Sequence, residues 1–84
     1  MKIQLNEQEV IGNYKFDGFP VMTRGFQARF RKLAPVIARK TLMLIKQRAR
    51  EIGADYFQVA KFSNTTFWII DDVEHITFLL PEEY

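Results

Sequence analysis

The spacing of the hydrophobic residues changes at Gly53, from the period of a helix to the period of a strand. Before Gly53, apolar residues recur every three or four positions, which is the pattern of one buried helix face. The residues of this predicted face are Ala38, Thr41, Leu42, Ile45, Ala49 and Ile52. Pro35 suits the first turn of a helix and Gly53 suits the position after its end, so the sequence predicts a helix over 35–52.

After Gly53, aromatic and β-branched residues follow a period of two, which is typical of strands. Ser63-Asn64-Thr65 has turn chemistry, so residues 56–70 are predicted to form a hairpin. A third strand is predicted over 75–80, where Pro81 ends it. The predicted fold class is therefore α+β: one main helix packed on a small, mostly antiparallel sheet with a C-terminal three-stranded meander.

The first third of the chain has weaker patterns. Residues 2–5 alternate like an edge strand, and residues 10–16 could form another. Asp17-Gly18-Phe19-Pro20 predicts a turn.

Residues 24–33 fit two structures. As a strand, they would place Phe26 and Phe30 on one side and basic residues on the other; as a helix, they would continue into residue 35 with a kink there. We favour the strand, because Pro35 suits the start of a helix better than its interior. In both structures Phe26 and Phe30, beside Leu33, are expected to pack into the core.

A chain of 84 residues is expected to form a single domain over 1–84. It has no Cys, which fits a reducing compartment, and its N-terminal residues lack the apolar region of a signal peptide. No apolar run approaches the roughly 20 residues that span a bilayer. We expect a cytoplasmic protein without a membrane partner.

The formal net charge of +2 hides a strong segregation of charge along the chain. Residues 18–50 contain nine Arg and Lys and no Asp or Glu. Residues 51–84 contain seven Asp and Glu and only one Lys. The middle third is therefore strongly basic, and the C-terminal third is acidic.

Long basic side chains along a helix and an adjacent strand are typical of nucleic-acid backbone binding. Six of the nine basic residues are Arg, whose planar group suits phosphate contacts. No helix-turn-helix, zinc-finger or RNP-type pattern indicates base-specific recognition. We expect a small nucleic-acid-binding protein, with RNA favoured over DNA. The candidate binding residues are Arg24, Arg29, Arg31, Lys32, Arg39, Lys40, Lys46 and Arg50.

Other partners also fit these patterns. The basic surface could bind an acidic or RNA-associated protein, or it could lie against the acidic meander with no partner. The chain could also be an inhibitor or adaptor, such as a phage- or plasmid-type antagonist of a host nuclease or toxin that also contacts its RNA. Trp68 lies in a strand that is apolar on both faces, and one helix covers only one face. We therefore expect a homo-oligomer or a partner interface on the other face.

Catalytic patterns are sparse. The chain has one His and no Cys, and its glycines form no phosphate-binding loop, so we expect no catalytic residue, metal or cofactor. The only dense titratable cluster comprises Asp71, Asp72, Glu74 and His75. It could hold a general base or a hard cation, but a solvated turn between strands is favoured. We expect a binding protein, not an enzyme.

Overall fold

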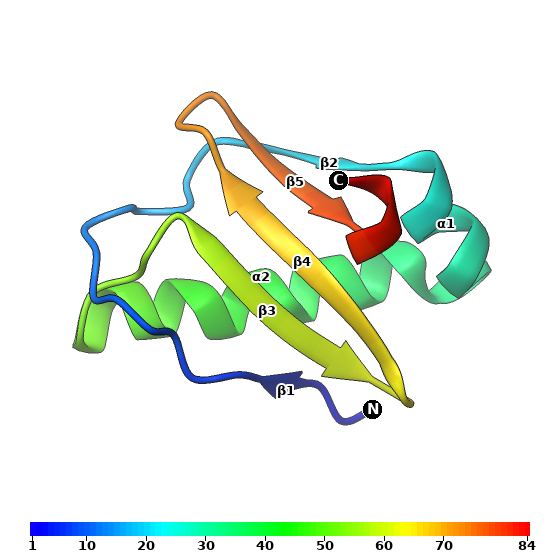
Figure 1. The fold of residues 1–84 in the computed structure, drawn as a ribbon, viewed down its shortest axis with the longest axis horizontal. Coiled ribbons are helices and arrows are strands. Elements are labelled where there is room, and N and C mark those ends of the chain that lie inside the picture. The colour runs from blue at the N-terminus through cyan, green and yellow to red at the C-terminus, as the bar shows by residue number, and fades with distance from the viewer.

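Five strands form one sheet in the order β1-β3-β4-β5-β2. The computed structural model describes all of residues 1–84 (Figure 1). The strands are β1 (Gln4–Leu5), β2 (Phe19–Met22), β3 (Phe57–Phe62), β4 (Thr65–Asp71) and β5 (His75–Leu79). All neighbouring strands are antiparallel except β2 and β5, which are parallel. The predicted α+β fold, with its C-terminal three-stranded meander, is confirmed.

The long helix α2 (Ala34–Glu51) crosses one face of this sheet (Figure 1). Its bounds lie one residue from those predicted at each end. Ile37, Thr41 and Ile45 are fully buried against the sheet. Gly53 follows the helix with a φ of +95°, a conformation that favours glycine. Ile52, which was predicted to be buried, is 59% exposed, because the helix ends at Glu51 and the backbone leaves its axis there.

The hairpin of β3 and β4 matches its prediction. Phe62 pairs with Thr65, so only Ser63 and Asn64 form the loop. Their φ values are +49° and +68°, as in the two-residue turns that match the twist of antiparallel strands. Ordinary turn chemistry therefore sets the register of the central strand pair.

The strand favoured for residues 24–33 is wrong. This segment forms helix α1 (Arg24–Phe30) and a 3-10 turn (Arg31–Leu33), and the chain bends at Arg31 instead of at Pro35. The Thr23 hydroxyl caps α1 by accepting a hydrogen bond from the Phe26 N–H at 3.2 Å. A spacing of four on this helix buries both Phe26 and Phe30, as expected, whereas Leu33 is 46% exposed.

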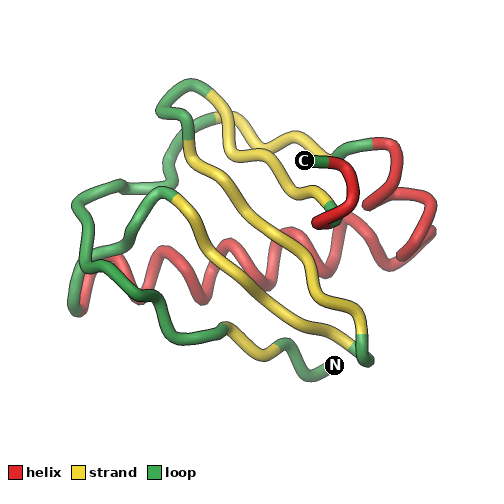
Figure 2. The backbone as a smooth tube through the Cα atoms, viewed as in Figure 1, coloured by secondary structure: helices red, strands yellow, loops and turns green.

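The turn predicted over residues 17–20 is also wrong, because Phe19–Met22 form strand β2. The N–H groups of Phe19 and Thr23 donate to carbonyl oxygens of the β5 side, at 2.9 and 3.0 Å. Since β2 lies at the edge of the sheet, it tolerates Pro20, which has no N–H. Residues 10–16 do not form a strand, and only Tyr14 bridges to Ala54. This region is part of a long loop around one end of the sheet (Figure 2).

Aromatic rings fill the space between the helices and the sheet. Phe26 meets Phe30, Phe67 and Phe78 with ring centroids 4.9 to 5.7 Å apart. These tilted and edge-to-face arrangements are favourable for aromatic pairs. Neither α1 nor α2 combines the length and apolar character needed to cross a membrane.

Candidate nucleic-acid interface

Helix α2 carries four of the eight predicted binding residues on its outer side. Arg39, Lys46 and Arg50 are separated by seven and four positions, so they lie along one line of the helix surface. Arg39 and Arg50 are exposed and Lys46 is half-buried. Lys40 is exposed beside this line. The sequence correctly placed Arg39, Lys46 and Arg50 opposite the buried Ile45, with Lys40 beside them.

The other four predicted residues lie on the preceding helical segment. They are Arg24 and Arg29 on α1, and Arg31 and Lys32 in the 3-10 turn. All four are exposed. Because the segment is helical, Arg29 and Arg31 do not project from the same side of a strand as expected. The Arg29 guanidinium instead lies 5.9 Å from the centre of the Phe30 ring.

None of these eight cations forms an ion pair. The only acid–base pair within 4.0 Å in the protein joins Asp72 and His75. The acidic C-terminal strands therefore do not neutralise the basic helices by direct contact. Unpaired exposed cations keep their full attraction for a polyanion, since no carboxylate has to be displaced first.

Arg31 is held in an unusual backbone conformation. Its φ of 52° and ψ of −123° belong to a region that favours glycine. A side chain held in such a region costs about 1–3 kcal/mol of stability. The arginine side chain is exposed and makes no ion pair within the protein that would offset this cost.

Arg48 is the ninth cation of the basic segment, and it has a structural role. Its guanidinium donates a 2.7 Å hydrogen bond to the side-chain oxygen of Gln58, which is buried in β3. The Gln58 amide in turn donates to Gln8 and to the Asp55 carbonyl. Desolvation lowers the pKa of Arg48, and the nearby charge of Glu7 opposes this effect. This network joins the end of α2 to the sheet and the N-terminal loop.

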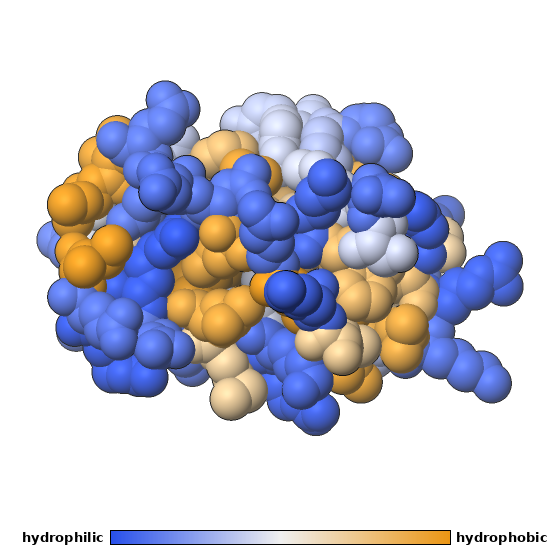
Figure 3. All heavy atoms as spheres, turned by 90° about the horizontal axis from the view of Figure 1, so that it is seen from below, coloured by the Kyte–Doolittle hydropathy of each residue, from blue (hydrophilic) through white to orange (hydrophobic).

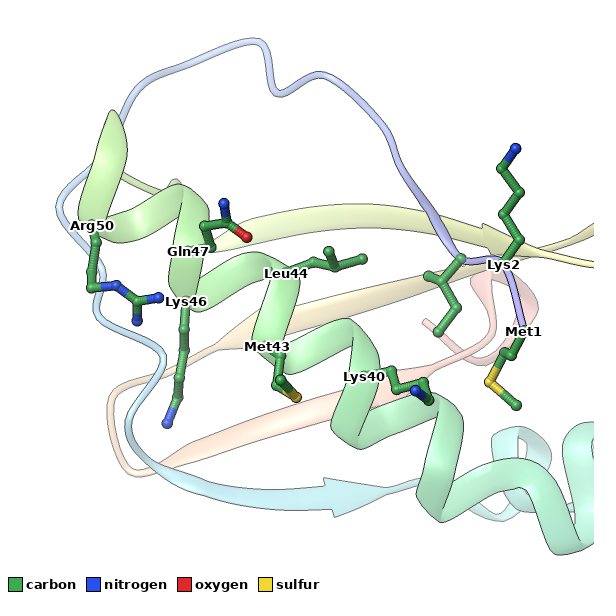
Figure 4. A pocket seen from close by; sticks show the side chains of 9 residues that line it. Met1, Lys2, Lys40, Met43, Leu44, Lys46, Gln47 and Arg50 are labelled. Atoms are coloured by element: carbon green, nitrogen blue, oxygen red, sulfur yellow. The ribbon is translucent and has the colours of Figure 1, made fainter.

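A shallow hollow of about 600 Å³ lies between the N-terminal segment and α2 (Figure 4). Four cations line it, and no Asp or Glu does: these cations are Lys2, Lys40, Lys46 and Arg50. Lys2 was not among the predicted residues. It lies 38 positions before Lys40, and only the pairing of β1 with β3 brings the N-terminal segment beside the helix.

Apolar side chains also line this hollow. They are Met1, Ile3, Met43 and Leu44. Figure 4 shows Leu44 extending from α2 toward the N-terminal segment. Met43 is 65% exposed, so its apolar side chain is open to solvent between Lys40 and Lys46. The hollow thus combines an apolar lining with positive charge.

A second hollow of about 490 Å³ lies on the other side of the same helix end, against the loop that contains Tyr14. Lys46 and Arg50 line both hollows, so they stand on the ridge between them. Figure 3, the view from below, shows hydrophobic side chains in separate patches with hydrophilic side chains around them. Because Lys46 and Arg50 line both hollows, the basic surface is a ridge with a depression on each side.

The titratable cluster of Asp71, Asp72, Glu74 and His75 forms the turn that joins β4 to β5. The buried Asp71 carboxylate accepts hydrogen bonds from the N–H groups of Phe16 and Val73, at 3.0 and 2.7 Å. The Asp72 carboxylate accepts from the N–H of His75 at 2.7 Å. Both carboxylates thus have backbone partners at a turn between strands, as favoured from the sequence, but Asp71 is buried at the end of β4 and not solvated as expected. No group of three or more potential metal ligands is assembled in the structure.

Comparison of the chain with protein-family models, with curated proteins and with solved structures finds no match.

Proposed function

We propose that this protein binds nucleic acid, RNA in preference to DNA, through phosphate contacts along the outer side of α2. One observation carries the proposal: the eight basic residues are exposed or half-buried, and none is paired with a carboxylate. The rise of a helix separates Arg39 from Lys46 by about 10 Å and Lys46 from Arg50 by about 6 Å. These separations span a few successive phosphates of a nucleic-acid strand.

The hollow beside α2 supports a preference for single-stranded nucleic acid, which RNA presents in its loops and ends. Unpaired bases need apolar surface close to the cations that hold their backbone, and single-stranded RNA presents such bases in loops and ends. Met43 and Leu44 supply that surface next to Lys40 and Lys46. Without a groove-reading element, binding depends on charge and on single-stranded character more than on base sequence.

The cytoplasm is the proposed compartment, because a chain without Cys has no disulfide to form in an oxidising one. Binding, not catalysis, is the proposed mode of action. It uses surface cations that form no ion pair within the protein.

The test compares two variants with equal net charge. Arg39→Gln with Lys46→Gln lowers the net charge by two, as does Lys61→Glu on the opposite side of the sheet. Fluorescence anisotropy with labelled single-stranded RNA, single-stranded DNA and duplexes of both should show weaker binding only for the helix variant. Wild-type affinity should fall steeply with salt, with a logarithmic slope of about 0.7 per phosphate contact on single strands. Equal affinities for the wild type and both variants would contradict the proposal.

A second candidate function is favoured by one observation, the exposed apolar face of the sheet. Phe19, at 69% exposure, and the half-buried Trp68 are large hydrophobic side chains on this face. This favours an inhibitor or adaptor that binds another protein. A nuclease-treated pulldown would test it: a stoichiometric protein that is retained by the Arg39/Lys46 variant and lost with Trp68→Glu supports this function.

A further inference from the structure

The face of the sheet opposite α2 is apolar across its central strands. Residues alternate along a strand, so one set in β3 and β4 faces α2 and the other faces away. Phe57 and Val59 of β3, and Trp68 and Ile70 of β4, belong to the outward set and are only half-buried, whereas their neighbours on the inner side are buried. We call this surface the open face.

Aromatic side chains form a continuous row across the open face. The ring centroid of Phe57 lies 5.0 Å from that of Trp68, and the centroid of Trp68 lies 5.6 Å from that of Tyr84. Phe19 is exposed on β2, at the far edge of the sheet. Rings at these distances pack on one another and leave an apolar surface toward solvent.

No helix covers the open face. Both α1 and α2 lie on the other side of the sheet, and only the 3-10 turn Pro81–Glu83 reaches over one end of it (Figures 1 and 2). Sheets of small proteins are usually polar on an uncovered face, because solvent contacts each outward side chain. An aromatic row in that place indicates a surface that is covered in the working protein.

Charge argues against nucleic acid as the occupant of this face. Its outward strand positions include one cation, Lys61, and the basic ridge lies on the opposite side of the sheet. The phosphates of a nucleic-acid backbone would meet little positive charge on this face. The occupant must instead bring a broad apolar surface, and a second copy of the chain has one.

The dimensions of the molecule suit a dimer through this face. The two longer extents of the backbone are 31 and 25 Å, and the open face lies across them (Figure 1). An ellipse of that size, which outlines the whole backbone, covers about 600 Å², so an interface over this entire side would be at the lower end of specific interfaces, about 600–1,000 Å² per partner. Two sheets stacked face to face, about 10 Å apart, are a common arrangement of apolar sheet faces.

We infer that two copies of this chain pack sheet to sheet through the open face, with Trp68 near the centre of the interface. A two-fold axis places the aromatic rows of both copies against each other, so the same surface serves both partners. A chain this small, without disulfides, also gains stability when its remaining apolar surface is buried.

Trp68 is the only tryptophan in the chain, so its fluorescence reports on this face without engineering. The experiment is sedimentation equilibrium of the nuclease-treated full chain in high salt, where bridging by nucleic acid is suppressed, across nanomolar to high micromolar concentrations. We expect a monomer–dimer equilibrium, and we expect Trp68 emission to move to shorter wavelength as the dimer forms.

Two variants test the face itself. Trp68→Glu, and independently Phe19→Glu at the more exposed edge, should each weaken dimerisation at least tenfold while circular dichroism shows an intact fold. Ile11→Glu is the matched control, because Ile11 is equally exposed, at 69%, but lies in the loop before β2. A wild type that stays monomeric at every concentration overturns the inference. So does a dimer that Trp68→Glu and Phe19→Glu both leave unchanged.

Discussion

The outer side of α2 and the open face lie on opposite sides of one sheet, and both face solvent. The helix side has unpaired cations with a few apolar side chains between them, whereas the open face has an aromatic row and a single lysine. Salt weakens attraction between exposed charges but not the burial of apolar surface. Two surfaces of one small domain can therefore hold different partners under different conditions, and variants can separate them.

The largest expected effect is on stability, from a substitution in the core that lies between the two surfaces. Phe26 is fully buried among Phe30, Phe67 and Phe78. Phe26→Ala should destabilise the fold by about 3–5 kcal/mol, because it removes apolar contacts and leaves a cavity. Urea unfolding followed by circular dichroism measures this loss, and both surfaces should lose function together. A loss below about 1 kcal/mol would show that this ring is not the centre of the core.

The second prediction compares how a variant on each surface affects RNA binding and dimerisation. On an RNA too short for two proteins, Arg39→Gln with Lys46→Gln should weaken binding about tenfold, equivalent to about 1.4 kcal/mol. Trp68→Glu should change the affinity by less than about threefold, because a charge on the far side of the sheet is screened by salt. Anisotropy titrations and sedimentation of the same samples give both readouts. If either variant affects both properties equally, the two surfaces do not act separately.

The third prediction concerns the C-terminal turn at the edge of the open face. The Glu83 carboxylate accepts hydrogen bonds from the Leu80 N–H, the Thr23 hydroxyl and the Gly25 N–H, at 2.8, 2.6 and 2.8 Å. These bonds lower the pKa of Glu83 from its ordinary value of 4.5, with the Leu80 N–H the largest cause and partial desolvation opposing it. A lowered pKa means that the ionised carboxylate stabilises the fold above that ordinary value. The contribution is lost as the pH falls through the lower folded-state pKa.

Glu83→Gln should therefore cost about 0.5–1 kcal/mol at neutral pH, in the lower part of the range for a lost helix cap because Glu83 is exposed. The difference from wild type should shrink in acid, where the wild-type carboxylate becomes protonated. Thermal unfolding across this pH range is the measurement. Glu82→Gln is the control, since Glu82 is exposed and makes no side-chain hydrogen bond. Equal effects of the two substitutions would show that the hydrogen bonds of the Glu83 carboxylate do not stabilise the fold.

The last prediction concerns Arg31, where one substitution should raise stability and weaken RNA binding, both by small amounts. Arg31→Gly should raise the free energy of unfolding by about 0.5–1 kcal/mol, because glycine relieves the strain at a φ of 52°. It should also weaken RNA binding about threefold by removing one cation. Lys32→Gly removes one cation next to it but places glycine in the 3-10 turn, so it should lower both stability and affinity. A loss of stability in Arg31→Gly would contradict the claim that the backbone at Arg31 is strained.

Local patterns predicted the parts of the fold that depend on neighbouring residues. The three- and four-residue spacing placed α2 within one residue at each end, and Ser63 and Asn64 gave the hairpin its loop. Residues 24–33 could not be decided in this way, because Phe26 and Phe30 satisfy both a period of two and a spacing of four. One contact that holds α1 is remote: in addition to the local cap at Thr23, the Glu83 carboxylate accepts a hydrogen bond from the Gly25 N–H, 58 positions earlier.

The basic surface was predicted in part for the same reason. Counting charges identified the cations of α2, since a helix of known phase fixes which residues share a side. It could not include Lys2, which joins Lys40 only through the pairing of β1 with β3. The parallel pairing of β2 with β5 was equally out of reach, because Phe19–Met22 carries a proline and reads locally as a turn.

The opposite placement of α2 and the open face has a consequence for long RNA. If two sheets stack face to face, both α2 helices point outward, separated by three layer spacings of about 10 Å each. Each particle then has two anchoring points that cannot both reach the same short stretch of backbone. Long transcripts would be cross-linked and compacted, and turbidity or light scattering would rise at stoichiometric protein, whereas short oligonucleotides would leave the solution clear.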